Sequence, residues 1–269
     1  MADIRSKINE IYSLEQLSAG ISLIHGIHPL AKLLGTMVYI LCIVSFDRYA
    51  FSSLVPYIFY PVILMSLAEI PWGMIFKRTL LALPFCLFAG ICNLFIDRGI
   101  LLELGAFSLS YGAVSFFTIL FRTFLCVSAV LILVSITRFS ELTGEMSHLH
   151  LPGIFITLFE MTYRYLGTLL EEALSMYTAY HLRSHEQKAL EMKDLGSFIG
   201  QLLIRSFDRA ERIYQAMKCR GYVLRDDYPT RRAWVKADYL YLLLTCGLPI
   251  FLRFINLPLF FGGWLGGLL

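Results

Sequence analysis

The stretch Tyr111–Ile136 reads YGAVSFFTILFRTFLCVSAVLILVSI and contains one charged residue, Arg122. A helix that crosses a bilayer needs about 20 mostly apolar residues, and this stretch is longer than that. A charge near the bilayer centre costs about 2.5–3.5 kcal/mol on insertion scales, so Arg122 should face other helices or extend toward the membrane surface. Two roles are open for its side chain. One is a packing tie to Glu69 or to a backbone carbonyl, which we favour, and the other is a contact with a second subunit.

The rest of the chain is also too apolar for a soluble domain. Hydrophobic residues make up 57% of the 269 residues, against about 45–50% in soluble domains, and the mean hydropathy is +0.66. Further predicted spans are Leu33–Phe46, Phe51–Ala68, Leu80–Ile96 and Tyr239–Phe254. The Gly-rich segment 257–269 is either half of a sixth span or an interfacial tail. Residues 1–20 lack the apolar core of a secretory signal peptide, so the first span is expected to be the uncleaved insertion signal.

The distribution of Lys and Arg predicts the orientation of these spans. Residues 138–236 hold 14 of the 23 Lys and Arg, together with 12 of the 20 Asp and Glu. Residues 1–32 add Arg5, Lys7 and Lys32, and the 69–79 loop adds Lys77 and Arg78, whereas the alternate loops carry only Arg48 and Arg98. Because cytoplasmic loops are enriched in Lys and Arg, the N-terminus, the 69–79 loop and residues 138–236 are predicted to be cytoplasmic. Residues 97–111 are predicted to form a short extracytoplasmic hairpin.

The charged segment is predicted to contain two long helices. The first runs over about 154–183 after a break at Pro152. The second runs over about 194–220, with Asp194 as its N-cap and Gly221 as its C-terminal glycine. Each carries an apolar stripe at helical spacing: Phe159, Tyr163, Leu166, Leu170, Ala173, Tyr177 and Tyr180 on the first, and Leu195, Ile199, Leu202, Ser206, Ala210, Ile213 and Met217 on the second. Such stripes are more often internal core than partner surface, so an internal role is expected from the pattern.

Each of the two helices ends on an arginine that a small residue follows. The two triplets are Leu182-Arg183-Ser184 and Cys219-Arg220-Gly221. A guanidinium at a helix tip can bind carboxylates or carbonyls of a partner in a bidentate manner. The alternative is that each cation only complements the helix dipole, which is worth about 0.3–1 kcal/mol. The spacing by itself favours this alternative.

Taken together, these features resemble the T component (EcfT type) of energy-coupling-factor transporters, and the cobalt-type member CbiQ in particular. The resemblance covers most of the chain and rests on Ser22, His25, Pro29 and Lys32 before the first span, Arg122, Tyr163-Arg164-Tyr165 with Glu171, and the two arginine triplets. In this family, two Arg-centred motifs end the coupling helices, and each docks into a groove of one ATPase. The motifs usually begin with Ala, and Leu182 and Cys219 depart from that pattern.

The resemblance implies an all-α integral membrane protein with five or six transmembrane helices and two long cytoplasmic coupling helices. The expected segments are 1–137 (an N-terminal cytoplasmic segment and spans one to four), 138–236 (the coupling helices) and 237–269 (the C-terminal spans). The implied ATPase-binding residues are Arg183, Arg220, Leu182, Ser184, Cys219 and Gly221. The residues with implied structural or coupling roles are Arg122, Tyr163, Arg164 and Glu171.

The resemblance also implies a non-catalytic, multi-pass subunit in the cell membrane of a prokaryote. Its expected partners are two ABC-type ATPases and a membrane S component that binds the substrate, with or without a small accessory membrane subunit. No phosphate-binding loop of the form G-x-x-x-x-G-K-[ST] occurs in the chain, so ATP and Mg²⁺ are expected on the ATPases only. The mixed charges argue against nucleic acid as a partner.

Cobalt ion is the expected substrate, in support of cobalamin biosynthesis. A general T component for nickel or vitamin uptake is the alternative within transport, and a membrane enzyme with a helical cytoplasmic domain is the alternative from another class. Copurified ATPases would separate the coupling subunit from the enzyme.

Two sets of polar residues invite a chemical role that the sequence does not support. The histidines form the pairs His25/His28, His148/His150 and His181/His185. The last pair has the i, i+4 spacing of a metal chelate, but no third ligand is near it in sequence, so no metal site is predicted. Glu171 and Glu172 have no catalytic partner at a fixed spacing and are expected to be solvated or paired with an arginine of a neighbouring helix. The cysteines form no C-x-x-C pair and are expected to act as small buried hydrophobes.

Overall fold

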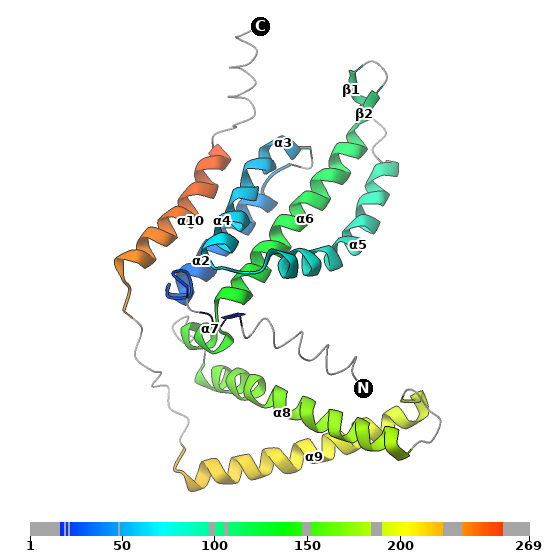
Figure 1. Cartoon of the computed structure of the whole chain (residues 1–269), viewed down its shortest axis with the longest axis vertical. Coiled ribbons are helices and arrows are strands. Elements are labelled where there is room, and N and C mark those ends of the chain that lie inside the picture. Colours follow the sequence, from blue (N-terminus) through cyan, green and yellow to red (C-terminus); the bar gives the residue numbers. More distant parts are fainter. Residues whose placement is uncertain are drawn as a thin grey trace. The chain divides into compact units, whose positions relative to one another are not determined.

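The structure is a computed structural model that describes residues 17–18, 20, 22–47, 49–96, 100–104, 107–146, 152–183, 190–222 and 233–254. The chain divides into two compact units. We call one the apolar unit (Ile8–Leu142 and Arg232–Leu269) and the other the charged unit (Met1–Lys7 and Thr143–Arg231). The described residues are almost entirely helical, as expected, apart from one small hairpin (Figure 1).

The apolar unit contains a helix at every stretch that the sequence predicts to be a span. In chain order its elements are α2 (Pro29–Val44), α3 (Phe51–Leu54), η1 (Val55–Ile58), α4 (Phe59–Leu67), α5 (Trp72–Ile96), β1 (Ile100–Leu104), β2 (Phe107–Ser110), α6 (Tyr111–Ile136) and α10 (Lys236–Phe254). The second predicted span is divided among α3, η1 and α4, with Pro56 at the start of the 3-10 turn, where its missing N–H breaks the α-helical bonding. Segment 257–269 lies outside the described residues.

Two of the described helices are long and apolar enough to cross a membrane on their own. They are Gly112–Ile136 in α6 and Lys236–Phe254, which is α10. Pro29–Val44 and Phe51–Leu67 are shorter apolar helices. The helical state of the predicted spans is therefore confirmed, while the number that cross the membrane stays a prediction.

The core of the apolar unit lies where α2 contacts both α6 and α10, and α5 runs along α6 (Figure 1). Within it, the Tyr39 ring stacks on Tyr60 with 3.9 Å between ring centroids. The Tyr39 hydroxyl donates to the Tyr57 carbonyl at 2.9 Å, and the Tyr57 hydroxyl donates to the Pro249 carbonyl at 2.8 Å. Because a buried hydroxyl is costly without a partner, these bonds allow tyrosines in the core and tie α2, η1 and α10 together.

The close approach of α2 and α10 depends on Gly35. A Cβ atom added at this position would lie 2.5 Å from the Thr245 Oγ1 and 3.0 Å from the Thr245 Cβ. Thr245 is almost fully buried, and its hydroxyl already donates to the Tyr241 carbonyl at 2.8 Å. Small residues let membrane helices approach closely, and here the spacing leaves no room for a side chain at residue 35.

The predicted hairpin at 97–111 is confirmed as a hairpin. Strands β1 and β2 pair antiparallel, with Glu103 opposite Ser108 and Leu104 opposite Phe107. The hairpin joins α5 to α6 (Figure 1).

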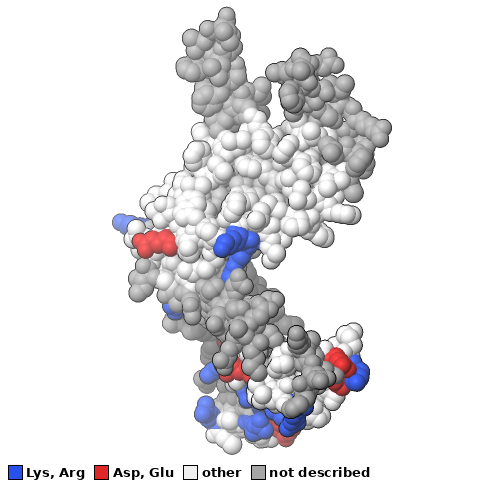
Figure 2. All heavy atoms as spheres, turned by 45° about the vertical axis from the view of Figure 1, so that its right-hand side comes forward, with Lys and Arg blue, Asp and Glu red and all other residues white. Residues whose placement is uncertain are grey.

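The charged unit contains α8 (Gly153–Arg183) and α9 (Met192–Cys219), and α7 (Phe139–Met146) spans the boundary between the two units. The blue and red side chains visible in Figure 2 gather mainly around α8 and α9, in keeping with the charge pattern of the sequence. Helix α8 has the predicted bounds to within one residue. Helix α9 begins two residues before its predicted start and ends at the predicted turn.

The predicted N-cap of α9 is wrong. Glu191 occupies that position, and its side chain makes no capping bond. Asp194 lies in the first turn of α9, where a carboxylate still complements the positive end of the helix dipole. The Asp194 carboxylate accepts a hydrogen bond from the Tyr180 hydroxyl of α8 at 2.7 Å. A contact with another helix has therefore taken the place of the local cap.

Candidate coupling site

Helices α8 and α9 form a V. They lie close together where α8 ends and α9 begins, and they separate toward the opposite end (Figure 1). At the narrow end, the Tyr180–Asp194 hydrogen bond joins the helices, and this bond raises the pKa of the Tyr180 hydroxyl above its usual value. Farther along, Glu172 lies 3.5 Å from an Arg205 nitrogen and 3.3 Å from an Arg209 nitrogen. The V is therefore held by polar contacts that run from its narrow end to past the middle of α9.

These contacts separate the two neighbouring glutamates of α8. Glu172 pairs with arginines of α9, which confirms the expectation of an arginine partner for this residue. Glu171 is exposed. Its coupling role, and those of the exposed Tyr163 and Arg164, stay predictions.

The expected internal role of the apolar stripes is correct only in part. On α9, Leu202, Ile213 and Met217 are half-buried, but no residue of this helix is fully buried. Ile199 is 54% exposed, and the neighbouring Phe207 is 67% exposed. On α8, exposed large apolar side chains include Ile154, Phe155, Leu158, Phe159, Tyr163 and Leu166. Much of the apolar surface of both helices is therefore exposed, and exposed apolar patches of this kind mark interaction surfaces.

The two arginines that end the helices are both exposed. Arg183 is the last residue of α8, and Arg220 is the C-cap of α9. Leu182 is 73% exposed, and Cys219 is also exposed. Ser184 lies outside the described residues. A pocket of about 560 Å³ at the narrow end of the V is lined by Arg183, Tyr180, Asp194 and Arg205, among others.

Backbone groups determine the conformation of the chain at the Arg220 tip. Gly221 has a φ of 70°, the left-handed region in which glycine is favoured. Its N–H donates to the Lys218 carbonyl at 3.0 Å, and the Tyr222 N–H donates to the Met217 carbonyl at 3.0 Å. This is the Schellman arrangement, which satisfies the last carbonyls of a helix. The Arg220 guanidinium is therefore not needed to cap those carbonyls, and its docking role stays a prediction.

Arg122 makes the packing tie that the sequence favours, although not to Glu69. Its guanidinium donates to the Phe46 carbonyl at 2.6 Å and to the Asp47 carbonyl at 3.1 Å. Arg253 of α10 donates to the Ser45 carbonyl at 3.1 Å. Cations are favourable at the carbonyl end of a helix, so the two arginines stabilise the C-terminal end of α2. Glu69 lines a pocket with residues that precede the start of α2, whereas the partners of Arg122 follow the end of that helix.

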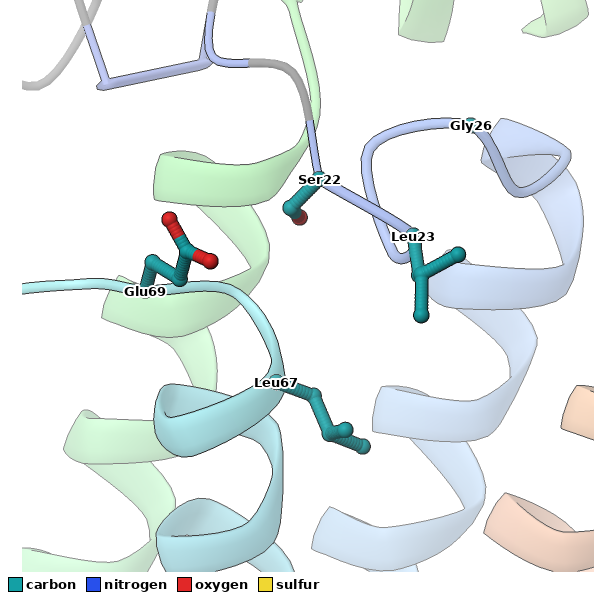
Figure 3. A pocket seen from close by; sticks show the side chains of 5 residues that line it. All are labelled: Ser22, Leu23, Gly26, Leu67 and Glu69. Atoms are coloured by element: carbon teal, nitrogen blue, oxygen red, sulfur yellow. The ribbon is translucent and has the colours of Figure 1, made fainter.

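Glu69 instead lines a pocket of about 560 Å³ with Ser22, Leu23, Gly26 and Leu67. Its φ of 55° places it in the left-handed region, which is uncommon for a residue other than glycine. In Figure 3 the Glu69 carboxylate and the Ser22 hydroxyl lie on one side of this pocket, and the Leu23 and Leu67 side chains lie on the other. The Ser22 hydroxyl already bonds to His25 Nδ1 at 2.7 Å.

The described histidines have structural contacts. His25 Nε2 bonds to the Leu17 carbonyl at 3.0 Å. His28 is the N-cap of α2, and the His181 ring lies parallel to Tyr177 at 6.4 Å. Within the described ranges, no group of three or more His, Cys, Asp or Glu side chains comes together. His148, His150 and His185 lie outside those ranges, so the absence of a metal site stays a prediction.

A group of buried polar residues at the start of α2 was not predicted as a unit. Lys32 and Asp238 are both fully buried. Lys32 Nζ donates to the Ile136 carbonyl at 2.9 Å, and the Asp238 carboxylate accepts from the His28 N–H and the Val235 N–H, both at 2.8 Å. Lys32 belongs to the residues that carry the family resemblance, but Ile136, whose carbonyl it binds, is 104 positions away. The one local signal for Asp238 is its place in the first turn of a helix, where acids reach back to cap.

The apolar unit contains two helices of transmembrane length, and the charged unit contains two long helices whose terminal arginines are exposed. The family model CbiQ, described as cobalt transport protein, matches residues 20–229. Because this match covers most of the chain, the chain belongs to the CbiQ family. Membership of this family indicates that the chain is a membrane transport protein and a T component of energy-coupling-factor transporters. It is also consistent with a non-catalytic role.

The chain is also similar to two individual proteins. The chain is 23% identical over 256 residues to the energy-coupling factor transporter transmembrane protein EcfT of Streptococcus equi subsp. equi, covering 89% of this chain and 94% of that protein. It is 30% identical over 175 residues to the uncharacterized protein MJ1571 of Methanocaldococcus jannaschii, covering 60% of this chain. The match spans 59% of the length of MJ1571.

Proposed function

We propose that this chain is the transmembrane coupling subunit of an ATP-driven energy-coupling-factor importer for cobalt ion. It would link two cytoplasmic ATPases to a membrane S component that binds the substrate. The observation that carries this proposal is the placement of Arg183 and Arg220 at the exposed ends of two long helices that splay apart. Membership of the CbiQ family supports cobalt, and the similarity to EcfT supports the coupling role.

In the proposed mechanism, each ATPase binds one arginine tip, and ATP with Mg²⁺ binds only to the ATPases. When the ATPases close on ATP, the two tips move, and the angle between α8 and α9 changes. Packed elements switch between discrete arrangements rather than deform continuously, so the long helices carry the motion to the S component. The exposed apolar side chains of α8 and α9 provide surface on which another subunit can pack.

Purification in mild detergent tests this proposal directly. The affinity-purified chain should copurify with two different ATPases or with two copies of one ATPase. A membrane S component should be present in the same preparation. Mass spectrometry identifies these partners. Metal analysis and uptake assays of the purified complex should show cobalt. Nickel in place of cobalt, or a vitamin-binding S component, would change the substrate and keep the coupling role. Turnover of a substrate by the chain alone, without ATPases, would replace the coupling role with that of an enzyme.

Labelling of single cysteines tests the proposed topology. In a background without the native cysteines, a cysteine at Glu191 should react with a membrane-impermeant maleimide only from the cytoplasmic side. A cysteine at Glu103 in β1 should react only from outside, because the basic loops are expected to be cytoplasmic. The reverse labelling pattern would show that the proposed orientation is inverted. A third cysteine near the C-terminus would distinguish five spans from six.

Replacing His181 and His185 together by Ala should leave cobalt uptake within a few-fold of wild type. A selective transport site needs several convergent ligands of suited geometry, and the proposed location of this pair is cytoplasmic, where a captured ion has already been imported. Uptake of Co²⁺ into proteoliposomes and ATP hydrolysis are measured on the same preparation. Loss of uptake with intact assembly and hydrolysis would assign the ion to this pair instead.

A further inference from the structure

The chain passes between the apolar unit and the charged unit at three places, and two of these connections adjoin the described helices α6 and α10. One connection follows α6, whose last residue is Ile136, and the other precedes α10, whose first residue is Lys236. Both connections begin at residues that are bonded to the same turn of α2. We call the side chains that make these contacts the anchor cluster: His28, Lys32, Trp234 and Asp238.

Lys32 holds the first connection. Its ammonium group donates to the carbonyl of Ile136 at 2.9 Å and to the carbonyl of His25 at 3.1 Å. Ile136 is 2% exposed, and the Lys32 side chain is fully buried. A cation at the carbonyl end of a helix is favourable, and here the cation comes from another helix, so the end of α6 is fixed to the start of α2.

Asp238 and Trp234 hold the second connection. One carboxylate oxygen of Asp238 accepts the Val235 N–H, and the other accepts the His28 N–H, each at 2.8 Å. The Trp234 ring stacks on the His28 ring with 4.6 Å between centroids and a 20° interplanar angle. His28 in turn caps α2, since its Nδ1 accepts the Leu30 N–H at 3.3 Å. The segment that enters α10 is thus fixed to the same turn as the end of α6.

Stability alone is a weak reason for this arrangement. Burying charged groups is costly, and replacing buried ionic groups by apolar ones of similar volume is often neutral or stabilising. The arrangement differs from the arginine contacts at the other end of α2, because those contacts lie on no connection to the charged unit. What the anchor cluster adds is a common attachment point for both connections.

We propose that the anchor cluster is the positioning element that passes a displacement of the charged unit to the membrane helices. Because both connections are bonded to one turn of α2, a pull on either one moves α2, α6 and α10 together. This inference rests on the proposed function, in which ATPases displace α8 and α9. Lys32 and Asp238 are positioning residues that touch neither ATP nor the transported ion.

The test uses the complete complex in proteoliposomes and measures Co²⁺ uptake per ATP hydrolysed. Lys32→Gln should keep copurified ATPase and ATP hydrolysis, while the uptake ratio falls at least about tenfold, within the 5–150-fold range of typical coupling between sites. Lys32→Arg, which keeps the cation, should recover most of the ratio. Asp238→Asn, which keeps the shape and loses the charge, should lower it as Lys32→Gln does.

Arg253→Gln is the matched control, because Arg253 also donates to a carbonyl at an end of α2, but away from both connections. Its uptake ratio should stay within about twofold of wild type, well below the smallest typical coupling. An unchanged ratio in Lys32→Gln, or an equal fall in Arg253→Gln, would overturn the proposal. If Lys32→Gln fails to assemble, an unchanged ratio in Asp238→Asn overturns it. A wild-type complex without ATPases refutes the proposed function itself, which is a separate outcome.

Discussion

Replacing Arg183 and Arg220 together by Glu is expected to abolish copurification of the ATPases while the chain still inserts into the membrane. Truncating one partner of a buried interfacial charge pair costs about 2–5 kcal/mol, and reversing the charge should cost more. Each ATPase therefore loses at least about 2 kcal/mol, or about thirtyfold in affinity. Because both tips are exposed in the chain itself, the change should leave its folding nearly intact. Quantitative mass spectrometry of the affinity-purified complex measures the result.

Single reversals and a matched control make this result interpretable. Arg183→Glu and Arg220→Glu should each weaken the association, and the double variant should be the weakest. Arg212→Glu reverses another exposed arginine of α9, away from the tip, and should leave the amount of copurified ATPase close to wild type. Wild-type levels of ATPase with the double variant would exclude the arginine tips as the docking residues.

The second large effect is expected at Gly35. Substitution by Ala should destabilise the apolar unit by about 1–3 kcal/mol, the usual cost of adding a methyl group to a full core. The added Cβ would lie 2.5 Å from the Thr245 Oγ1, and a short, buried threonine side chain cannot move away without the helix. The expected observation is a lower midpoint of thermal unfolding for the purified chain in detergent.

Gly247 of α10 provides the control, because a Cβ added there meets no atom within 4 Å. Gly247→Ala should leave the midpoint unchanged or raise it, since Ala is favoured over Gly in a helix by about 1 kcal/mol. Adding Thr245→Ala to Gly35→Ala removes the nearest atom and should recover part of the loss. A Gly35→Ala chain that unfolds at the wild-type temperature would show that α2 and α10 are not so close.

The sequence was sufficient where a local signal decides the structure. Pro152 precedes α8, and Gly221 ends α9 with a positive φ; both act through the backbone of their own neighbourhood, so their effect can be read without the fold. The helical state of the predicted spans followed from apolar length alone. These features depend on neighbours within a turn or two.

The sequence was insufficient where a contact joins distant segments of the chain. Asp194 looks like an N-cap, but Tyr180 of α8 bonds to its carboxylate. Arg122 makes the expected tie to the backbone, but the sequence did not indicate that its partners are the Phe46 and Asp47 carbonyls. The bond from Lys32 to the Ile136 carbonyl spans 104 positions. Every residue has a backbone carbonyl, so the residue type at the acceptor position gives no signal of such a bond. A single sequence therefore does not predict it.

The narrow end of the V makes the two arginine tips mechanically unequal. Arg183 follows Tyr180, whose hydroxyl joins α8 to α9, so this tip sits close to the fulcrum. Arg220 lies on a lever arm that extends about 16 Å past Arg209, at about 1.5 Å per residue. A swing of about 10° on such an arm shifts its tip by about 3 Å. In the proposed complex, equal forces from the two ATPases would then exert the larger torque through the Arg220 arm.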